Sequence, residues 1–248
     1  MSGSRQTGSC CLKLATVTIP GRFRGPPGSG NGGYVVGLLA KYAPAPVDVR
    51  LRVPPPLEVP LEVLADEDGG LELVSGTTVL ASAMPATVDL EVPPAPSARE
   101  AEEAGRRYVG FTTNPFPGCF VCGPDRAPGD GLRIFTGPVN AHGPGLYAAP
   151  WRPDASLAGT RNTIRPEFMA AALDCPGYFT VASPGQLMLL GSLAMRIERS
   201  VAVDEPCVIA AWSLGGAGRK WRAATALYGA DGSCAARAVA TWIALAAG

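Results

Sequence analysis

The order of apolar segments repeats once along this chain. In each half, a loop leads into a short stretch with apolar residues at helical spacing, and several strand-like runs follow. A helix followed by antiparallel strands, present twice, predicts an α+β fold with two similar units. In the first half, the apolar stretch 14–19 precedes the helix-like stretch 34–42, and strand-like runs follow at 47–53, 57–64, 71–74 and 77–90.

The second half has its helix-like stretch at Pro166–Asp174, with proline in the favoured first position. Cys175-Pro176-Gly177 is expected to end that helix. Between the halves, residues 97–107 predict a capped, solvated connecting helix. The strand-like runs of the second half are 131–135, 145–149, 188–199, 207–214, 219–228 and 235–245. We therefore predict a disordered lead at 1–11, an N-terminal unit at 12–96, a linker helix at 97–115 and a C-terminal unit at 116–248.

Composition excludes several classes of function. The chain has 21 basic and 21 acidic residues, a balance that argues against binding to nucleic acid or to a membrane surface. No apolar run approaches the roughly 20 residues of a membrane span. Seven cysteines and an N-terminus without an apolar targeting segment favour a reducing, cytoplasmic setting. The richness in Ala, Gly, Pro and Arg is typical of a high-GC bacterium.

Three stretches resemble the hotdog thioesterase superfamily. They are the glycine-rich loop and helix start at 28–40, Cys119-Phe-Val-Cys-Gly-Pro124 with Gly131-Leu132 downstream, and the strand-rich tail at 191–243. The resemblance implies a double hotdog, in which each of two tandem units has a long helix wrapped by a curved antiparallel sheet. It also implies a monomer or a homodimer of such double units.

The resemblance implies one composite active site. In single-unit members the helix opens with His-Gly-Gly, a catalytic Asp follows eight positions after the first Gly, and two such helices pack antiparallel. This chain has Asn31-Gly32-Gly33 in the first half, with Ala40 at the carboxylate position. The second half has Pro166, which has no amide proton, at the first glycine position, and Asp174 at the carboxylate position. By this likeness the amides of Gly32 and Gly33 form the oxyanion hole and Asp174 is the general base, with Asn31 in place of the family's His.

The resemblance implies hydrolysis of a thioester of coenzyme A or of acyl carrier protein, with no cofactor besides the coenzyme A of the substrate. Related double-hotdog thioesterases have a Thr and a Gln beside their Asp, where Leu190 and Ala240 fall here. One alternative is therefore a non-catalytic, acyl-thioester-binding or regulatory protein. A second is a hotdog dehydratase or acyltransferase of specialised metabolism, with His142 acting beside Glu167 or Asp174. The residues expected to contact substrate are Tyr34, Glu167, Ser192, Arg219 and Lys220, the last two as candidates for the coenzyme A phosphates.

Two further features have simpler interpretations. Cys119-x-x-Cys122 is the spacing of a zinc or redox pair, but no second Cys or His pair stands at a supporting spacing. We therefore expect no metal and interpret both cysteines as apolar fillers of a tight turn. His142 is flanked by Gly143-Pro144-Gly145, which favours an exposed loop position.

Overall fold

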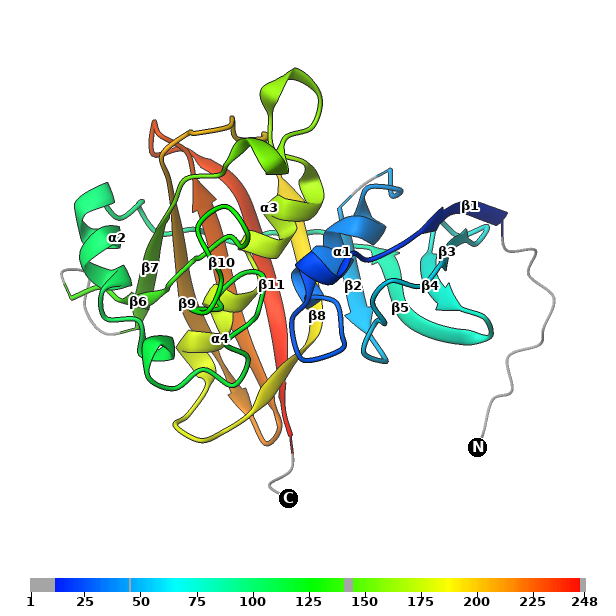
Figure 1. Ribbon diagram of the computed structural model, residues 1–248, viewed down its shortest axis with the longest axis horizontal. Coiled ribbons are helices and arrows are strands. Elements are labelled where there is room, and N and C mark those ends of the chain that lie inside the picture. The colour runs from blue at the N-terminus through cyan, green and yellow to red at the C-terminus, as the bar shows by residue number, and fades with distance from the viewer. Residues whose placement is uncertain (1–11, 45, 141–144, 246–248) are drawn as a thin grey trace.

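The computed structural model describes residues 12–44, 46–140 and 145–245. Within these ranges the strands form one antiparallel sheet of 11 strands, in the order β1-β3-β4-β5-β2-β8-β11-β10-β9-β7-β6 (Figure 1). Residues 1–11 and His142 lie outside the described residues. None of the described helices is long and apolar enough to cross a membrane.

The strand order divides this sheet into two equivalent parts. The first part runs β1-β3-β4-β5-β2, and the second runs β7-β9-β10-β11-β8 with the two-residue β6 added at its edge. The same order appears twice, which is the repeat that the sequence pattern predicts. The strands are β1 (Leu12–Val17), β2 (Val47–Leu51), β3 (Leu61–Ala65), β4 (Leu71–Ser75), β5 (Thr78–Pro85), β6 (Gly137–Pro138), β7 (Leu146–Trp151), β8 (Met188–Ile197), β9 (Cys207–Ala217), β10 (Lys220–Tyr228) and β11 (Cys234–Ala244).

The two parts are joined through backbone hydrogen bonds between β2 and β8. The pairing is antiparallel and sets Val47 opposite Met195 and Val49 opposite Leu193. Val49 and Leu193 are fully buried, so the joint carries part of the core. The sheet is therefore continuous across the middle of the molecule.

The helices cover both faces of the sheet. Helices α1 (Gly32–Ala40), α3 (Pro166–Ala172) and α4 (Cys175–Val181) lie on one face (Figure 1). Helix α2 (Ala98–Gly105) lies on the other, where Ala101 and Ala104 pack in a separate apolar cluster with residues of β7, β9 and β10. The short 3-10 helices are Gly21–Phe23, Val109–Phe111, Ala155–Leu157 and Thr160–Asn162.

The helices differ from the sequence prediction in three ways. The expected long helices are short: α1 has nine residues and α3 has seven. The helical path of α3 breaks at Asp174, where φ is −82° and ψ is −84°. Cys175-Pro176-Gly177 was expected to end the helix, but these residues begin the next helix, α4. Proline at the second position of α4 is tolerated because the amides of a first helical turn have no partner within the helix. Helix α2 is capped by Ser97 as predicted, but its buried alanines make it a packing element instead of a solvated one.

The strand predictions hold for most of the chain. Residues 131–135 form no strand; Leu132 and Ile134 instead donate single backbone hydrogen bonds to Phe120 and Val121. The run predicted at 77–90 ends at Pro85. The unit boundaries proposed at residues 96 and 115 stay predictions.

Two glycines of α1 bring its backbone against α3. A Cβ at Gly33 would lie 2.8 Å from the Ala170 carbonyl oxygen, and a Cβ at Gly37 would lie 2.5 Å from Glu167 Cα. Because the later glycine of α1 meets the earlier residue of α3, the two helices run antiparallel. Only glycine at both positions permits this approach.

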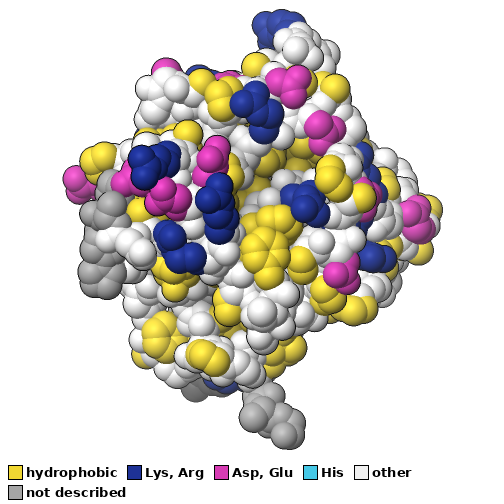
Figure 2. Space-filling model, turned by 60° about the vertical axis from the view of Figure 1, so that its left-hand side comes forward, with side chains coloured by type: hydrophobic (Ala, Val, Ile, Leu, Met, Phe, Trp, Pro, Cys, Tyr) yellow, Lys and Arg dark blue, Asp and Glu magenta, His cyan; other side chains and the backbone are white. Residues whose placement is uncertain are grey.

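The charged side chains are mixed over the surface. Figure 2 shows Lys, Arg, Asp and Glu interspersed on one face, with hydrophobic side chains gathered around a central hollow. This mixture agrees with the equal numbers of acidic and basic residues in the sequence.

Candidate active site

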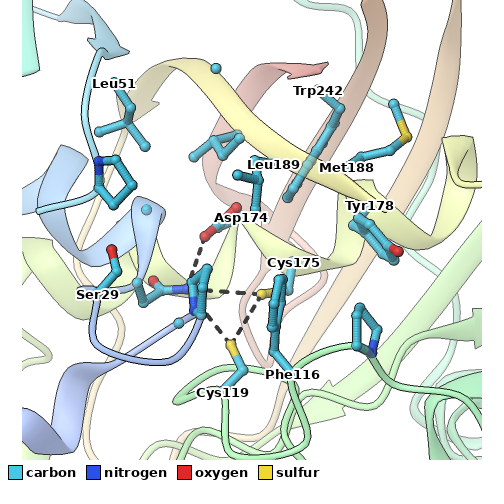
Figure 3. Close-up of a pocket in the computed structure, with 18 of the residues that line it drawn as sticks. Ser29, Leu51, Phe116, Cys119, Asp174, Cys175, Tyr178, Met188, Leu189 and Trp242 are labelled. Carbon is cyan, nitrogen blue, oxygen red and sulfur yellow. Dashed lines mark hydrogen bonds between the residues drawn. The ribbon is translucent and has the colours of Figure 1, made fainter. Parts of the chain in front are cut away.

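Asp174 meets the N-terminus of α1 in the middle of the molecule. The amide of Gly33 donates to Asp174 Oδ2 over 2.8 Å. Asn31 Nδ2 donates to the same oxygen over 3.0 Å, a bond drawn as a dashed line that ends on Asp174 in Figure 3. Asp174 stands at the break between α3 and α4, in the second half of the chain, whereas α1 belongs to the first half. The structure thus brings Asn31, Gly33 and Asp174 together across the two units.

Asn31 is held in one orientation by its role as the N-cap of α1. Its Oδ1 accepts a hydrogen bond from the amide of Tyr34 over 2.9 Å, a common way to satisfy a free amide of a first turn. The side-chain nitrogen is therefore directed away from the helix, toward Asp174. With 2% of its surface exposed, Asn31 is fixed before any substrate arrives.

The surroundings of Asp174 favour its neutral form. Burial raises the pKa of this carboxyl to about 7, with the negative charge of a Cys119 thiolate adding to the rise and the donors on Gly33 and Asn31 opposing it. Within the described residues, Asp174 Oδ1 is buried and has no hydrogen-bond partner. One oxygen is thus anchored, and the other is available to exchange a proton near neutral pH.

An apolar cavity of about 270 Å³ adjoins this carboxylate. Its walls come from both parts of the sheet, with Leu51 on β2 and Trp242 on β11. Figure 3 shows Phe116, Tyr178 and Met188 around the same space. Asp174 and Asn31 are among its few polar lining groups, so a ligand held here is mostly surrounded by hydrocarbon.

The two glycine amides at the start of α1 differ. Gly33 donates to Asp174, whereas the amide of Gly32 has no partner among the residues that the structure describes. Gly32 lines the cavity, and a Cβ there would lie 2.9 Å from Leu190 Cδ2. The N-terminus of a helix favours negative charge, so Gly32 offers a free donor to an oxyanion.

The equivalent place in the other unit has no such donor. Pro166 is the first residue of α3 and has no amide proton, and Ala40 ends α1 without a carboxylate. The place that corresponds to this site in the other unit therefore lacks both a donor and a carboxylate.

The residues predicted to contact substrate are placed elsewhere. Tyr34 is buried and stacks on Phe23, with ring centroids 4.5 Å apart. Glu167 forms an ion pair with Arg165, with 3.5 Å between Oε1 of Glu167 and a guanidinium nitrogen of Arg165. Neither lines the cavity, and Ser192 on β8 does not line it either.

Arg219 and Lys220 lie near the cavity at the end of β11. Arg219 Nε donates to the carbonyl of Ala244 over 2.9 Å, and Ala244 stands between the cavity residues Ile243 and Leu245. Both basic side chains are exposed. They are candidates for contacts outside the cavity and not within it.

Sequence reasoning missed a group of cysteines beside Asp174. Cys119 and Cys175 each have their sulfur 3.9 Å from Asn31 Nδ2, and the two sulfurs are 3.7 Å apart. Cys119 was expected to fill a turn and Cys175 to end a helix. The adjacency of Cys175 to Asp174 in the sequence is the one signal that pointed to the site.

Comparison with known proteins shows the fold. No protein-family model matches the sequence, and no curated protein matches it. Among solved structures, a presumed thioesterase II from Thermobifida fusca is similar over 95% of both chains, with 11% identity and a TM-score of 0.59. A conserved protein of unknown function with a hotdog fold from Alicyclobacillus acidocaldarius is similar over 94% of this chain and 93% of its own, with 10% identity and a TM-score of 0.57. The chain therefore has the hotdog fold along nearly its whole length, and the repeated strand order makes it a double unit.

Proposed function

We propose that this protein hydrolyses an acyl-thioester in the cavity at the N-terminus of α1. The observation that carries the proposal is the placement of Asp174, a buried carboxylate with one free oxygen, beside the free amide of Gly32 at the wall of an apolar cavity. A base and an oxyanion donor on opposite units are the two groups that thioester hydrolysis requires. The similarity to a presumed thioesterase II supports this reaction class over others.

Asp174 Oδ1 takes a proton from a water molecule as that water attacks the thioester carbonyl carbon. The carbonyl oxygen becomes negative and accepts a hydrogen bond from the Gly32 amide. The dipole of α1 adds to the stabilisation of this negative charge. One such donor is typically worth about 3–4 kcal/mol in the transition state. When the intermediate collapses, the carbon–sulfur bond breaks, and the thiolate leaves with the proton held by Asp174.

The cavity indicates the substrate class. Its apolar walls accept a hydrocarbon or aromatic acyl group, which buries its surface against residues such as Trp242 and Met188. The carrier, coenzyme A or acyl carrier protein, remains outside. Arg52 lines the cavity and Arg219 is exposed near its end, so both are placed to meet the phosphates of such a carrier.

The test is release of free thiol from a panel of acyl-CoA and acyl-carrier thioesters. Wild type is expected to turn over members of the panel, and Asp174→Asn to lose about 100-fold or more in kcat/KM. Glu167→Gln is the matched control, because it neutralises another buried carboxylate that does not line the cavity. Equal activity of wild type and Asp174→Asn would show that Asp174 is not the base.

A second candidate function is binding of an acyl-thioester without turnover. It is favoured by the engagement of the Gly33 amide with Asp174 and by the apolar Leu190 where related enzymes have a polar side chain. Tight binding of acyl-CoA by calorimetry, with no thiol released from any substrate of the panel, would select this function.

A further inference from the structure

Three cysteine sulfurs meet at the edge of the cavity. Cys119, Cys122 and Cys175 are buried, and their sulfur atoms all lie within 4.8 Å of one another. Cys119 and Cys122 belong to one turn, and Cys175 is the first residue of α4. We infer that these three thiolates form a binding site for one zinc(II) ion.

The spacing of the sulfurs fits a tetrahedral zinc ion. Zinc–sulfur bonds of about 2.3 Å set two ligand sulfurs about 3.8 Å apart in a tetrahedron. The sulfurs of Cys119 and Cys175 are 3.7 Å apart. The other two sulfur–sulfur distances are at most 4.8 Å. Side-chain rotations that move a sulfur by about 1 Å or less therefore bring all three sulfurs to tetrahedral spacing around one ion. Thiolate ligands favour zinc over magnesium or calcium.

Backbone hydrogen bonds fix the turn that carries Cys119 and Cys122. The Cys119 amide donates to the Phe116 carbonyl over 2.8 Å. The turn closes with a bond from the Gly123 amide to the Cys119 carbonyl over 2.9 Å. A side chain at Gly123 would place its Cβ 2.4 Å from the Pro117 carbonyl oxygen, so the turn requires glycine. The turn therefore fixes the backbone of Cys119 and Cys122 before an ion binds.

Neighbouring side chains fix this arrangement. Tyr108 donates its hydroxyl to the Cys122 carbonyl over 2.8 Å, and Asn114 Nδ2 donates to the same carbonyl over 3.2 Å. Asn31 Nδ2 lies 3.9 Å from the sulfurs of both Cys119 and Cys175. Such partners around a metal site orient its ligands and strengthen binding.

The fourth coordination position faces the cavity. All three cysteines line it, and within the described ranges no other Cys, His, Asp or Glu joins the cluster. Three protein ligands with one open position suit a zinc ion that accepts a ligand from solution. This site does not depend on the proposed thioesterase activity, because it is defined by different side chains. The inference departs from the expectation of no metal, which rested on the lack of a second cysteine pair. The third thiol belongs to Cys175, which is far from Cys119 and Cys122 in the sequence.

The test is metal binding by the full chain. The protein is treated with chelator, desalted under reducing conditions and titrated with zinc(II), and bound metal is measured by plasma mass spectrometry. We expect one zinc ion per chain. Titration with cobalt(II) should produce the charge-transfer absorption of thiolate–cobalt bonds and the visible bands of a tetrahedral ion.

Variants identify the ligands. Cys119→Ser, Cys122→Ser and Cys175→Ser should each lose stoichiometric zinc, whereas Cys207→Ser, which changes a buried cysteine outside the cluster, should retain it. Asn31→Ala should weaken zinc binding about 10–100-fold. Where a cluster variant does not fold, as judged by circular dichroism, the cobalt spectrum of wild type decides. Zinc well below one ion per chain, cobalt without thiolate bands, or equal loss in Cys207→Ser would overturn the inference.

Discussion

Replacement of Gly37 by alanine tests how closely α1 must approach α3. The added Cβ would lie 2.5 Å from Glu167 Cα and 2.7 Å from Ala170 Cβ. Ordinary contacts between carbon atoms are about 3.5–4.0 Å, so the helices must separate by about 1 Å. Glu167 Cα belongs to the backbone, so rotation of a side chain cannot relieve this contact.

The expected cost follows from two opposing effects. Overpacking a core costs about 1–3 kcal/mol, and a backbone contact belongs at the upper end of that range. Alanine in place of glycine within a helix recovers about 1 kcal/mol. We therefore expect Gly37→Ala to lower the free energy of unfolding by about 2 kcal/mol. For a chain of this length the Tm should fall by about 4–8 °C.

The measurement is urea and thermal unfolding followed by circular dichroism. Gly105→Ala is the matched control, because it also adds a Cβ within a helix, but the nearest atom would lie 3.3 Å away. Its stability should change by less than about 1 kcal/mol. Ala170→Gly in the Gly37→Ala background should restore only part of the loss, since the contact with Glu167 remains. If Gly37→Ala were as stable as wild type, the close packing of α1 on α3 would be refuted.

Further predictions concern the site and helix α2. In protein freed of metal, kcat/KM should rise with pH through about 7 as Asp174 loses its proton, because burial raises its pKa to that value; a flat profile between pH 5 and 9 would contradict this. Gly32→Pro removes the free amide yet keeps a residue favoured at the first helical position, so kcat should fall about 10²–10³-fold relative to Gly32→Ala, which adds a Cβ but retains the amide. Similar kcat values for these two variants would exclude the amide as the oxyanion donor. Ser97→Ala should lower the free energy of unfolding by about 1 kcal/mol in urea titrations, because Ser97 and Glu100 form a capping box at the start of α2.

Local patterns were sufficient to predict most elements of the fold. Alternation of apolar and polar residues predicted β2 at Val47–Leu51, and helical spacing after Asn31 predicted α1. The pairing of Asn31 and Gly33 with Asp174 could be predicted only through the resemblance to hotdog thioesterases, whose spacing selects positions that antiparallel helices bring together.

Features that depend on tertiary packing could not be predicted from the sequence. The break at Asp174 depends on a backbone conformation that its sequence context, Leu173-Asp174-Cys175, does not specify. Tyr34 was predicted to contact substrate, but its ring packs against Phe23 and Phe168. The meeting of Cys175 with Cys119 joins residues separated by 56 positions. Spacing within one segment carries no information about such a contact.

The pairing of β2 with β8 has a consequence for how the site behaves on dilution. Single hotdog units that assemble a site from two chains lose it when the concentration falls below the dissociation constant of the dimer. Here both contributors belong to one polypeptide and one continuous sheet, so their encounter is intramolecular and independent of protein concentration. Two units linked in one chain also need not be identical. In a symmetric dimer, by contrast, each substitution would appear in both units at once. Asn31 and Arg165 occupy corresponding positions before the two helices and have different roles. Asn31 caps α1 beside the carboxylate, and the guanidinium of Arg165 is stacked on Phe168.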